Sequence, residues 1–154
     1  MRAYVASPLG FSEAGRYFMY NEMLPKLEVA GITILDPWAL TSEEELAPII
    51  SLPYSAEKRS KWQAMNPIIA KRNTEAIDQA DFLVAVLDGV DIDSGTSAEI
   101  GYAFAKGKRI IGYRGDFRLS ADNEGSTVNL QVEYFIRESG GCIVSSLEEL
   151  LTKL

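Results

Sequence analysis

The sequence predicts a doubly wound α/β fold, in which a parallel sheet of five strands has helices on both faces. Two observations support this prediction. Short apolar runs bounded by Gly, Pro or Asp alternate along the chain with longer segments whose apolar residues have helical spacing. The length of 154 residues suits one domain, so we expect residues 1–154 to form a single flavodoxin- or Rossmann-like domain.

The first elements are expected as strand, helix and strand. Residues 3–6 form an apolar run that leads into Ser-Pro-Leu-Gly, which is typical of a buried strand ending in a turn. Residues 12–30 have apolar side chains at near-helical spacing, and Gly31 provides a helix stop. The apolar positions of this helix are Phe18, Leu24, Leu27 and Val29. The second strand is expected at residues 32–35, where an Asp-Pro pair ends it.

The middle of the chain is expected to contain one well-defined helix and the central strand. Residues 41–62 are mixed and polar, and Pro48 and Pro53 interrupt them, so only short helical pieces are expected there. The pair Asn66-Pro67 suits the N-cap and first position of a helix, which predicts a helix over residues 66–79. Residues 82–87 are apolar at every position, which is typical of a central strand covered on both faces.

The last third of the chain continues the alternation. A helix rich in small residues is expected over residues 97–106, and Gly107 ends it before a strand at residues 109–113. The remaining elements are expected as a helix over residues 130–138, a strand at 142–144 and an amphipathic helix over 147–154.

The composition excludes several kinds of site and partner. The 15 basic and 22 acidic residues give a net charge of −7, which argues against binding to nucleic acid polymers or anionic membranes. The chain has no histidine and a single cysteine, Cys142, so His-dependent nucleophilic sites, imidazole zinc sites and an internal disulfide are excluded. No membrane-spanning run or signal-peptide pattern is present, so we expect a cytoplasmic protein. We expect no metal and no cofactor.

Candidate binding residues follow the carboxyl ends of the expected strands, where sheets of this kind bind their ligands. They are Ser7 after the first strand, Asp36 and Trp38 after the second, and Asp93 and Gly95 after the third. The P-loop and G-x-G-x-x-G motifs are both absent, which argues against a phosphate cradle. The calcium-loop pattern also fails. Asp88, Asp91 and Asp93 leave a magnesium site as an alternative, although aspartates in a loop are more commonly just solvated.

Glu99 has two interpretations. With Thr96 it forms a capping-box pattern, and this pattern also occurs at four other places in the chain. However, Glu99 precedes Ile-Gly-Tyr-Ala-Phe-Ala, which predicts an apolar helix with little exposed face. A carboxylate on such a helix, beside a cleft at the strand ends, suits a nucleophile or a base.

Residues 93–103, Asp-Ser-Gly-Thr-Ser-Ala-Glu-Ile-Gly-Tyr-Ala, resemble the hallmark segment of the nucleoside 2-deoxyribosyltransferases. Tyr4, Asp81 and the pair Asn129-Leu130 match further positions of this family in the same order, so the resemblance spans nearly the whole chain. It implies an enzyme that transfers the 2-deoxyribosyl group between nucleobases. Its partners would be free nucleosides and nucleobases, and it would need no cofactor.

The resemblance also implies a role for individual residues. Glu99 would attack the anomeric carbon to form a covalent deoxyribosyl intermediate, and Tyr4 would hold Glu99 by a hydrogen bond. Asp93 would accept a hydrogen bond from the sugar 5′-hydroxyl. Asn129 would reach this hydroxyl from a neighbouring subunit, which implies a dimer-based homo-oligomer with a shared active site. Considered singly, Tyr4 is more commonly a core tyrosine and Asn129 a helix cap.

Asn73 departs from the family pattern, which often has an aspartate near the base. An amide can hydrogen-bond the base but cannot supply a proton, so Asp36 is considered as a substitute acid. Hydrolysis of deoxynucleosides or their 5′-monophosphates, and nucleoside binding without turnover, remain as alternative functions. Asp93 favours free nucleosides because a carboxylate repels a phosphate. The presence of Glu99 argues against a binding domain without activity.

Overall fold

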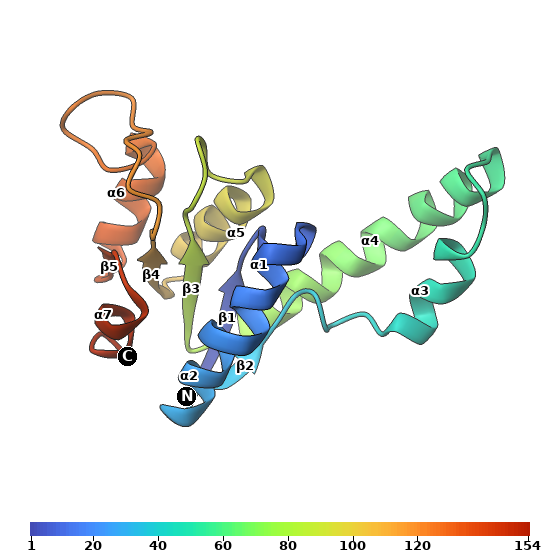
Figure 1. Ribbon diagram of the computed structural model, residues 1–154, viewed down its shortest axis with the longest axis horizontal. Coiled ribbons are helices and arrows are strands. Elements are labelled where there is room, and N and C mark those ends of the chain that lie inside the picture. The colour runs from blue at the N-terminus through green and yellow to red at the C-terminus, as the bar shows by residue number, and fades with distance from the viewer.

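The computed structural model describes residues 1–154 and has a five-stranded sheet at its centre (Figure 1). The strand order is β2-β1-β3-β4-β5, and all neighbouring strands are parallel. This order is that of a flavodoxin-like doubly wound sheet, so the predicted fold class is confirmed. The strands are β1 (Arg2–Ala6), β2 (Thr33–Leu35), β3 (Phe82–Val86), β4 (Arg109–Tyr113) and β5 (Cys142–Val144).

Helices cover both faces of the sheet. One face carries α1, α2 and α7, and the other carries α4, α5 and α6. Because successive side chains of a strand point to opposite faces, Ala3 and Val5 of β1 belong to the first core, whereas Tyr4 and Ala6 belong to the second. The helices are α1 (Glu13–Phe18), α2 (Leu24–Val29), α3 (Glu43–Ile50), α4 (Ala56–Gln79), α5 (Ser94–Ala105), α6 (Leu130–Glu138) and α7 (Leu147–Leu151), with a 3₁₀ turn at Leu9–Phe11 and a π-helical segment at Met19–Met23.

The predicted helix stops are confirmed, whereas one of the apolar side chains that predicted the first helix is exposed. Gly31 and Gly107 have φ values of 83° and 69°, a conformation that favours glycine at the end of a helix. Val29 is one of the four apolar positions with near-helical spacing, yet 90% of it is exposed. A helix turns by about 100° per residue, so Val29 lies on the opposite side from the buried Leu27.

The prediction that a helix starts at Asn66-Pro67 is wrong, because α4 already begins at Ala56. The Ser55 hydroxyl caps it by accepting a hydrogen bond from the Lys58 amide at 3.1 Å. Pro67 lies inside the helix and leaves the carbonyl of Gln63 without its helical donor. Both residues are exposed, so this carbonyl faces solvent, which allows the helix to continue.

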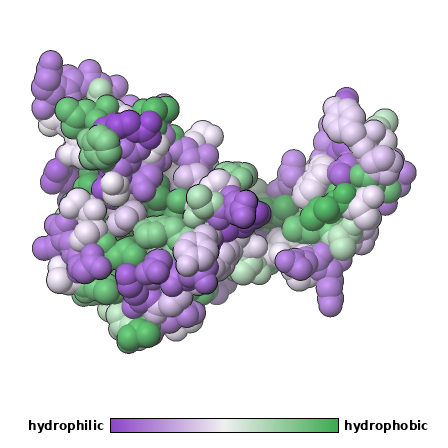
Figure 2. All heavy atoms as spheres, viewed as in Figure 1, coloured by the Kyte–Doolittle hydropathy of each residue, from purple (hydrophilic) through white to green (hydrophobic).

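An arm, formed by α3 and the first half of α4 (residues 43–70), projects from the body of the molecule (Figure 1). In the space-filling view the arm stands apart as a lobe joined to the body by a narrow neck (Figure 2). Although α4 has 24 residues, neither it nor any other helix is long and apolar enough to cross a membrane.

Candidate active site

A pocket of about 500 Å³ lies where the arm meets the body, at the carboxyl ends of β1 and β2. It lies beyond the ends of the neighbouring strands β1 and β3, the switch point at which sheets of this order bind ligands. The loops after β1 and β2, both helices of the arm and the start of α5 contribute to its wall. The lining residues are Ser7, Phe11, Pro37, Trp38, Thr41, Leu46, Trp62, Asn66, Ile69, Asn73, Asp93, Gly95, Thr96 and Glu99.

Most of the residues selected from the sequence meet at this pocket. Those that line it are Ser7, Trp38, Asn73, Asp93, Gly95 and Glu99. Tyr4 does not line the pocket itself, but its hydroxyl bonds Glu99 from within the core. Asp36 and Asn129 do not line this pocket.

The pair Tyr4 and Glu99 joins the central sheet to α5. Tyr4 is fully buried on β1, and its Oη donates a hydrogen bond to Oε1 of Glu99 at 2.6 Å. The Oε2 atom of Glu99 makes no hydrogen bond with the protein, although the side chain borders the pocket. One carboxylate oxygen is therefore held by the sheet, and the other is available to a ligand.

Burial raises the pKa of Glu99 above its ordinary value, and the nearby charge of Asp93 raises it further. The hydrogen bond from Tyr4 acts in the opposite direction, because it stabilises the carboxylate. Burial and the charge of Glu99 also raise the pKa of Tyr4, so its hydroxyl remains a donor at neutral pH. This arrangement provides a partly desolvated carboxylate with a fixed orientation.

Asp93 begins α5 as its N-cap, and its Oδ2 accepts a hydrogen bond from the Thr96 amide at 2.9 Å. The capping-box interpretation of Thr96 and Glu99 is therefore wrong, since Thr96 lies inside the helix. An N-cap carboxylate also suits the positive end of the helix dipole. Gly95 keeps the space beside Asp93 open, because a Cβ there would lie 3.0 Å from Asp93 Oδ2.

Trp38 forms a rigid aromatic wall of the pocket. Its indole Nε1 donates to the carbonyl oxygen of Ser7 at 3.0 Å, and its ring meets Phe11 edge-on at a centroid distance of 4.6 Å. Gly10 packs against the indole so closely that a Cβ there would lie 2.2 Å from ring atoms. A fixed flat ring of this kind suits stacking against a planar ligand such as a nucleobase.

One side of α4 supplies Asn73, which was predicted from the sequence, and three further pocket residues, Trp62, Asn66 and Ile69, which were not. Trp62, Asn66, Ile69 and Asn73 are spaced by four, three and four residues, so they lie along one face of a continuous helix. This pattern was available in the sequence. It was overlooked because the helix was expected to start at residue 66 rather than to pass through Pro67.

The Oδ1 atom of Asn73 is buried and has no hydrogen-bond partner. It is the one buried side-chain oxygen or nitrogen atom of the chain in this situation. A buried polar atom without a partner is uncommon and costs stability in a folded protein. Because Asn73 borders the pocket, a ligand that carries an N–H group can relieve this cost.

Asp36 is placed differently from the position expected of an acid beside the base. Its carboxylate is buried and accepts hydrogen bonds from the Trp38 amide at 3.0 Å and from the Tyr20 hydroxyl at 2.9 Å. It borders a second cavity of about 370 Å³ rather than the main pocket. Burial raises the pKa of Asp36, whereas both hydrogen bonds lower it. Asp36 therefore supports the turn that carries Trp38.

Asn129 is the N-cap of α6, where its Oδ1 accepts hydrogen bonds from the amides of Gln131 and Val132 at 3.0 and 3.3 Å. Its side-chain nitrogen makes no hydrogen bond within the chain. Asn129 does not border the pocket of its own subunit, so a role in a neighbouring subunit stays a prediction. No three His, Cys, Asp or Glu side chains are grouped to hold a metal ion, and this includes Asp88, Asp91 and Asp93.

The fold and the pocket together define an α/β protein with a buried carboxylate at the switch point of the sheet. Its sequence matches the profile described as nucleoside 2-deoxyribosyltransferase over residues 3–131. The chain belongs to this family and is an enzyme of the nucleoside deoxyribosyltransferase type. A search of curated protein sequences finds no match.

Solved structures show the same fold over almost the entire chain. A conserved protein from Enterococcus faecalis V583 is 27% identical and has a TM-score of 0.69, with 99% of this chain and 96% of that chain covered. A 2-deoxyribosyltransferase from Leishmania mexicana is 22% identical with a TM-score of 0.65, covering 98% and 94%. The 2-deoxyribosyltransferase from Bacillus psychrosaccharolyticus is 21% identical with a TM-score of 0.64, covering 98% and 90%.

Proposed function

We propose that this protein transfers the 2-deoxyribosyl group of free nucleosides from one nucleobase to another, with Glu99 as the nucleophile. The observation that carries this proposal is the Tyr4–Glu99 hydrogen bond of 2.6 Å at the edge of the pocket. This bond fixes one oxygen of a partly buried carboxylate and leaves the other oxygen free to react with a ligand in the pocket. This is the arrangement that covalent catalysis by a carboxylate requires.

The proposed reaction has two steps. In the first, a Glu99 oxygen forms a bond to C1′ of the deoxyribose while the N-glycosidic bond breaks, and the departing base keeps the bonding electron pair and takes up a proton from water. In the second, a nitrogen of the incoming base attacks C1′ and loses its proton to water, while the bond to Glu99 breaks and its electron pair returns to the carboxylate. Two inversions retain the configuration at C1′, as in a retaining glycosidase.

The charges around the pocket support a free nucleoside rather than a nucleotide. Asp93 and Glu99 are the charged side chains that line it, and no lysine or arginine does so. A phosphate would meet two carboxylates without a compensating cation, which is unfavourable in a partly buried site. In the proposed pose, Asp93 accepts a hydrogen bond from the 5′-hydroxyl and Trp38 contacts the base.

Asn73 is proposed to hold the base by hydrogen bonds. Its unpartnered Oδ1 suits an N–H group of a nucleobase. Since an amide has no proton to release near neutral pH, Asn73 does not act as the acid that protonates the departing base. The protein is further proposed to work as a dimer-based homo-oligomer, in which Asn129 of one subunit reaches the 5′-side of its neighbour's site.

Product analysis with deoxyinosine tests the proposed function directly. Incubation with deoxyinosine and adenine is expected to yield deoxyadenosine and hypoxanthine, whereas deoxyinosine alone should release little hypoxanthine. Free deoxyribose without adenine would indicate a hydrolase, because water then accepts the same intermediate. No hypoxanthine under either condition would contradict catalysis. Deoxyinosine 5′-monophosphate, as a matched substrate, should react poorly because of Asp93 and the absence of cations at the pocket.

The pH dependence of the reaction should follow the ionisation of Glu99. Because the pKa of Glu99 is raised, kcat/KM is expected to fall on acidification at a higher pH than for an ordinary glutamate. Tyr4→Phe removes a hydrogen bond that lowers the pKa of Glu99, so the acidic limb of the pH profile of kcat/KM should move to higher pH. Asp93→Asn removes a like charge and keeps an N-cap residue, so the limb should move to lower pH. Shifts in the same direction for both variants would contradict the assignment of the limb to Glu99.

A further inference from the structure

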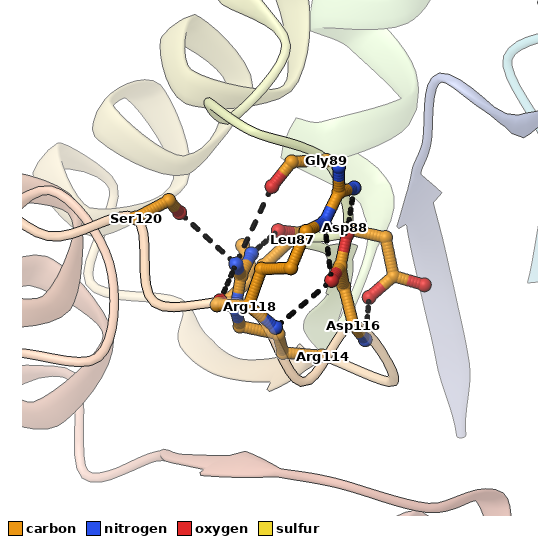
Figure 3. A network of polar contacts seen from close by, with 7 residues as sticks. All are labelled: Leu87, Asp88, Gly89, Arg114, Asp116, Arg118 and Ser120. Carbon is orange, nitrogen blue, oxygen red and sulfur yellow. Dashed lines mark hydrogen bonds and ion pairs between the residues drawn. The ribbon is translucent and has the colours of Figure 1, made fainter.

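Arg114 is a buried cation directly after β4, outside the pocket already described. Only 5% of it is exposed, and no carboxylate lies within ion-pair distance of it. Its guanidinium instead donates to four oxygen atoms on two different loops (Figure 3). These acceptors are the carbonyls of Leu87, Gly89 (3.3 Å) and Arg118 (2.6 Å), and the hydroxyl of Ser120 (3.0 Å).

Two of these acceptors lie at the start of the loop that connects β3 to α5. Residues 88–92 of this loop make no backbone–backbone hydrogen bonds, and among them only Ile92 is buried in the core. The loop is tied to the β4–α6 loop by Arg114 and by one further bond, from the Asp116 amide to Asp88 Oδ1 at 2.9 Å (Figure 3). The same loop ends at Asp93, whose carboxylate borders the pocket.

We infer that Arg114 is a positioning residue for the 5′-side of the substrate and that it acts through Asp93. This inference rests on the proposed function, in which Asp93 accepts a hydrogen bond from the sugar 5′-hydroxyl. The planar guanidinium has five donors, which allows one side chain to bridge both loops. A lysine at the same position has three donors on one nitrogen atom and cannot span the same set of acceptors.

The predicted effect is specific to one part of the substrate. If Arg114 sets the position of Asp93, its loss should weaken recognition of the 5′-hydroxyl and leave the reaction of a substrate without this group nearly unchanged. A general structural role would instead lower the rates of both substrates by the same factor. The ratio of kcat/KM for a 2′-deoxynucleoside to that for its 2′,5′-dideoxy analogue separates the two cases.

The experiment compares this ratio in four variants that are first shown to be folded by circular dichroism. Arg114→Lys is expected to lower the ratio by about fivefold or more, because Asp93 is no longer held against the 5′-hydroxyl. Asp93→Asn should lower it by about tenfold, because a neutral amide accepts the hydrogen bond of the 5′-hydroxyl more weakly than a carboxylate does. Ser120→Ala removes only one acceptor of Arg114, so it should lower the ratio by about twofold. Arg59→Lys, the matched control, makes the same change at an exposed arginine of the arm that neither lines the pocket nor contacts the two loops, so the ratio should stay at the wild-type value.

The outcomes distinguish this inference from the proposed function. A ratio that falls in Asp93→Asn but stays unchanged in Arg114→Lys and Ser120→Ala would overturn the role of Arg114 alone. A ratio that stays unchanged in Asp93→Asn would overturn the contact between Asp93 and the 5′-hydroxyl, and with it any action of Arg114 through Asp93. If Arg114→Lys does not fold, Ser120→Ala decides the question by the same measurement.

Discussion

Glu99→Gln is expected to lower the rate of deoxyribosyl transfer by about three orders of magnitude or more while the fold is retained. The amide has nearly the shape of the carboxylate, and its Oε1 can still accept the hydrogen bond from Tyr4. However, an amide oxygen is a poor nucleophile, so the bond to C1′ does not form. Single-turnover kinetics with deoxyinosine and adenine measure the loss.

The same variant should be at least as stable as the wild type at neutral pH. Because burial raises the pKa of Glu99 in the folded state, the stability that its neutral form provides is lost as pH rises through this raised value. Glutamine stays neutral and avoids that loss. Thermal unfolding at pH 7 should therefore give a Tm for Glu99→Gln that equals or exceeds that of the wild type, whereas a strong decrease would indicate a structural role.

A matched control and a direct observation complete the test of the nucleophile. Glu75→Gln makes the same chemical change at an exposed position on α4, outside the pocket, and should keep the wild-type rate. Mass spectrometry of the wild type with a deoxynucleoside alone should find a sugar adduct on the peptide that carries Glu99. An unimpaired rate in folded Glu99→Gln, or an adduct on another residue, would overturn the assignment.

The second large effect tests the proposed sharing of active sites between subunits. Glu99→Gln and Asn129→Ser proteins should each be nearly inactive, yet their mixed oligomers should regain activity. In a mixed dimer, the intact Glu99 of one subunit meets the intact Asn129 of the other. When equal amounts of the two proteins mix at random, about half of the dimers are mixed, and each of these has one complete site out of two. Roughly a quarter of the wild-type activity should therefore return.

Serine is the appropriate replacement for Asn129 because it is also a good N-cap. The start of α6 then stays capped, and the variant loses mainly the reach of the longer amide. Exposed apolar residues in the C-terminal half, such as Phe117 (96% exposed) and Tyr134 (53% exposed), supply surface that a homo-oligomer can bury. Mixed oligomers that are proven by differently tagged subunits but stay inactive would remove Asn129 from the neighbour's site.

Local sequence signals were sufficient for the elements of the sheet. The run of residues 82–87 is apolar at every position because β3 is covered on both faces, and its five strand residues are all buried. The boundaries of β4 and α6 follow from Gly107 and Asn129, which act on the backbone within a few residues of themselves. Such signals do not depend on the rest of the fold, so they can be recognised in the sequence alone.

The roles of Asp36, Thr96 and α4 depended on contacts between distant parts of the chain. The pattern of Thr96 and Glu99 satisfies the capping rule locally, but Asp93 caps α5 and Glu99 bonds Tyr4, which lies 95 residues away in the sequence. Asp36 follows a strand end as expected, yet its carboxylate is bound by Tyr20 and the Trp38 amide on the side away from the main pocket.

The sequence by itself determined the order of strands and helices along the chain, the net charge of the molecule and the choice of Glu99 as the residue to test. These properties depend on neighbouring residues, on composition or on matched motifs. Only the tertiary structure decided that α4 continues through Pro67 and brings Trp62, Asn66 and Asn73 to one wall of the pocket. The physical reason is that a helix is stabilised mainly by the packing of its buried face, which local propensity does not report. A proline that costs one hydrogen bond is tolerated when that carbonyl faces solvent.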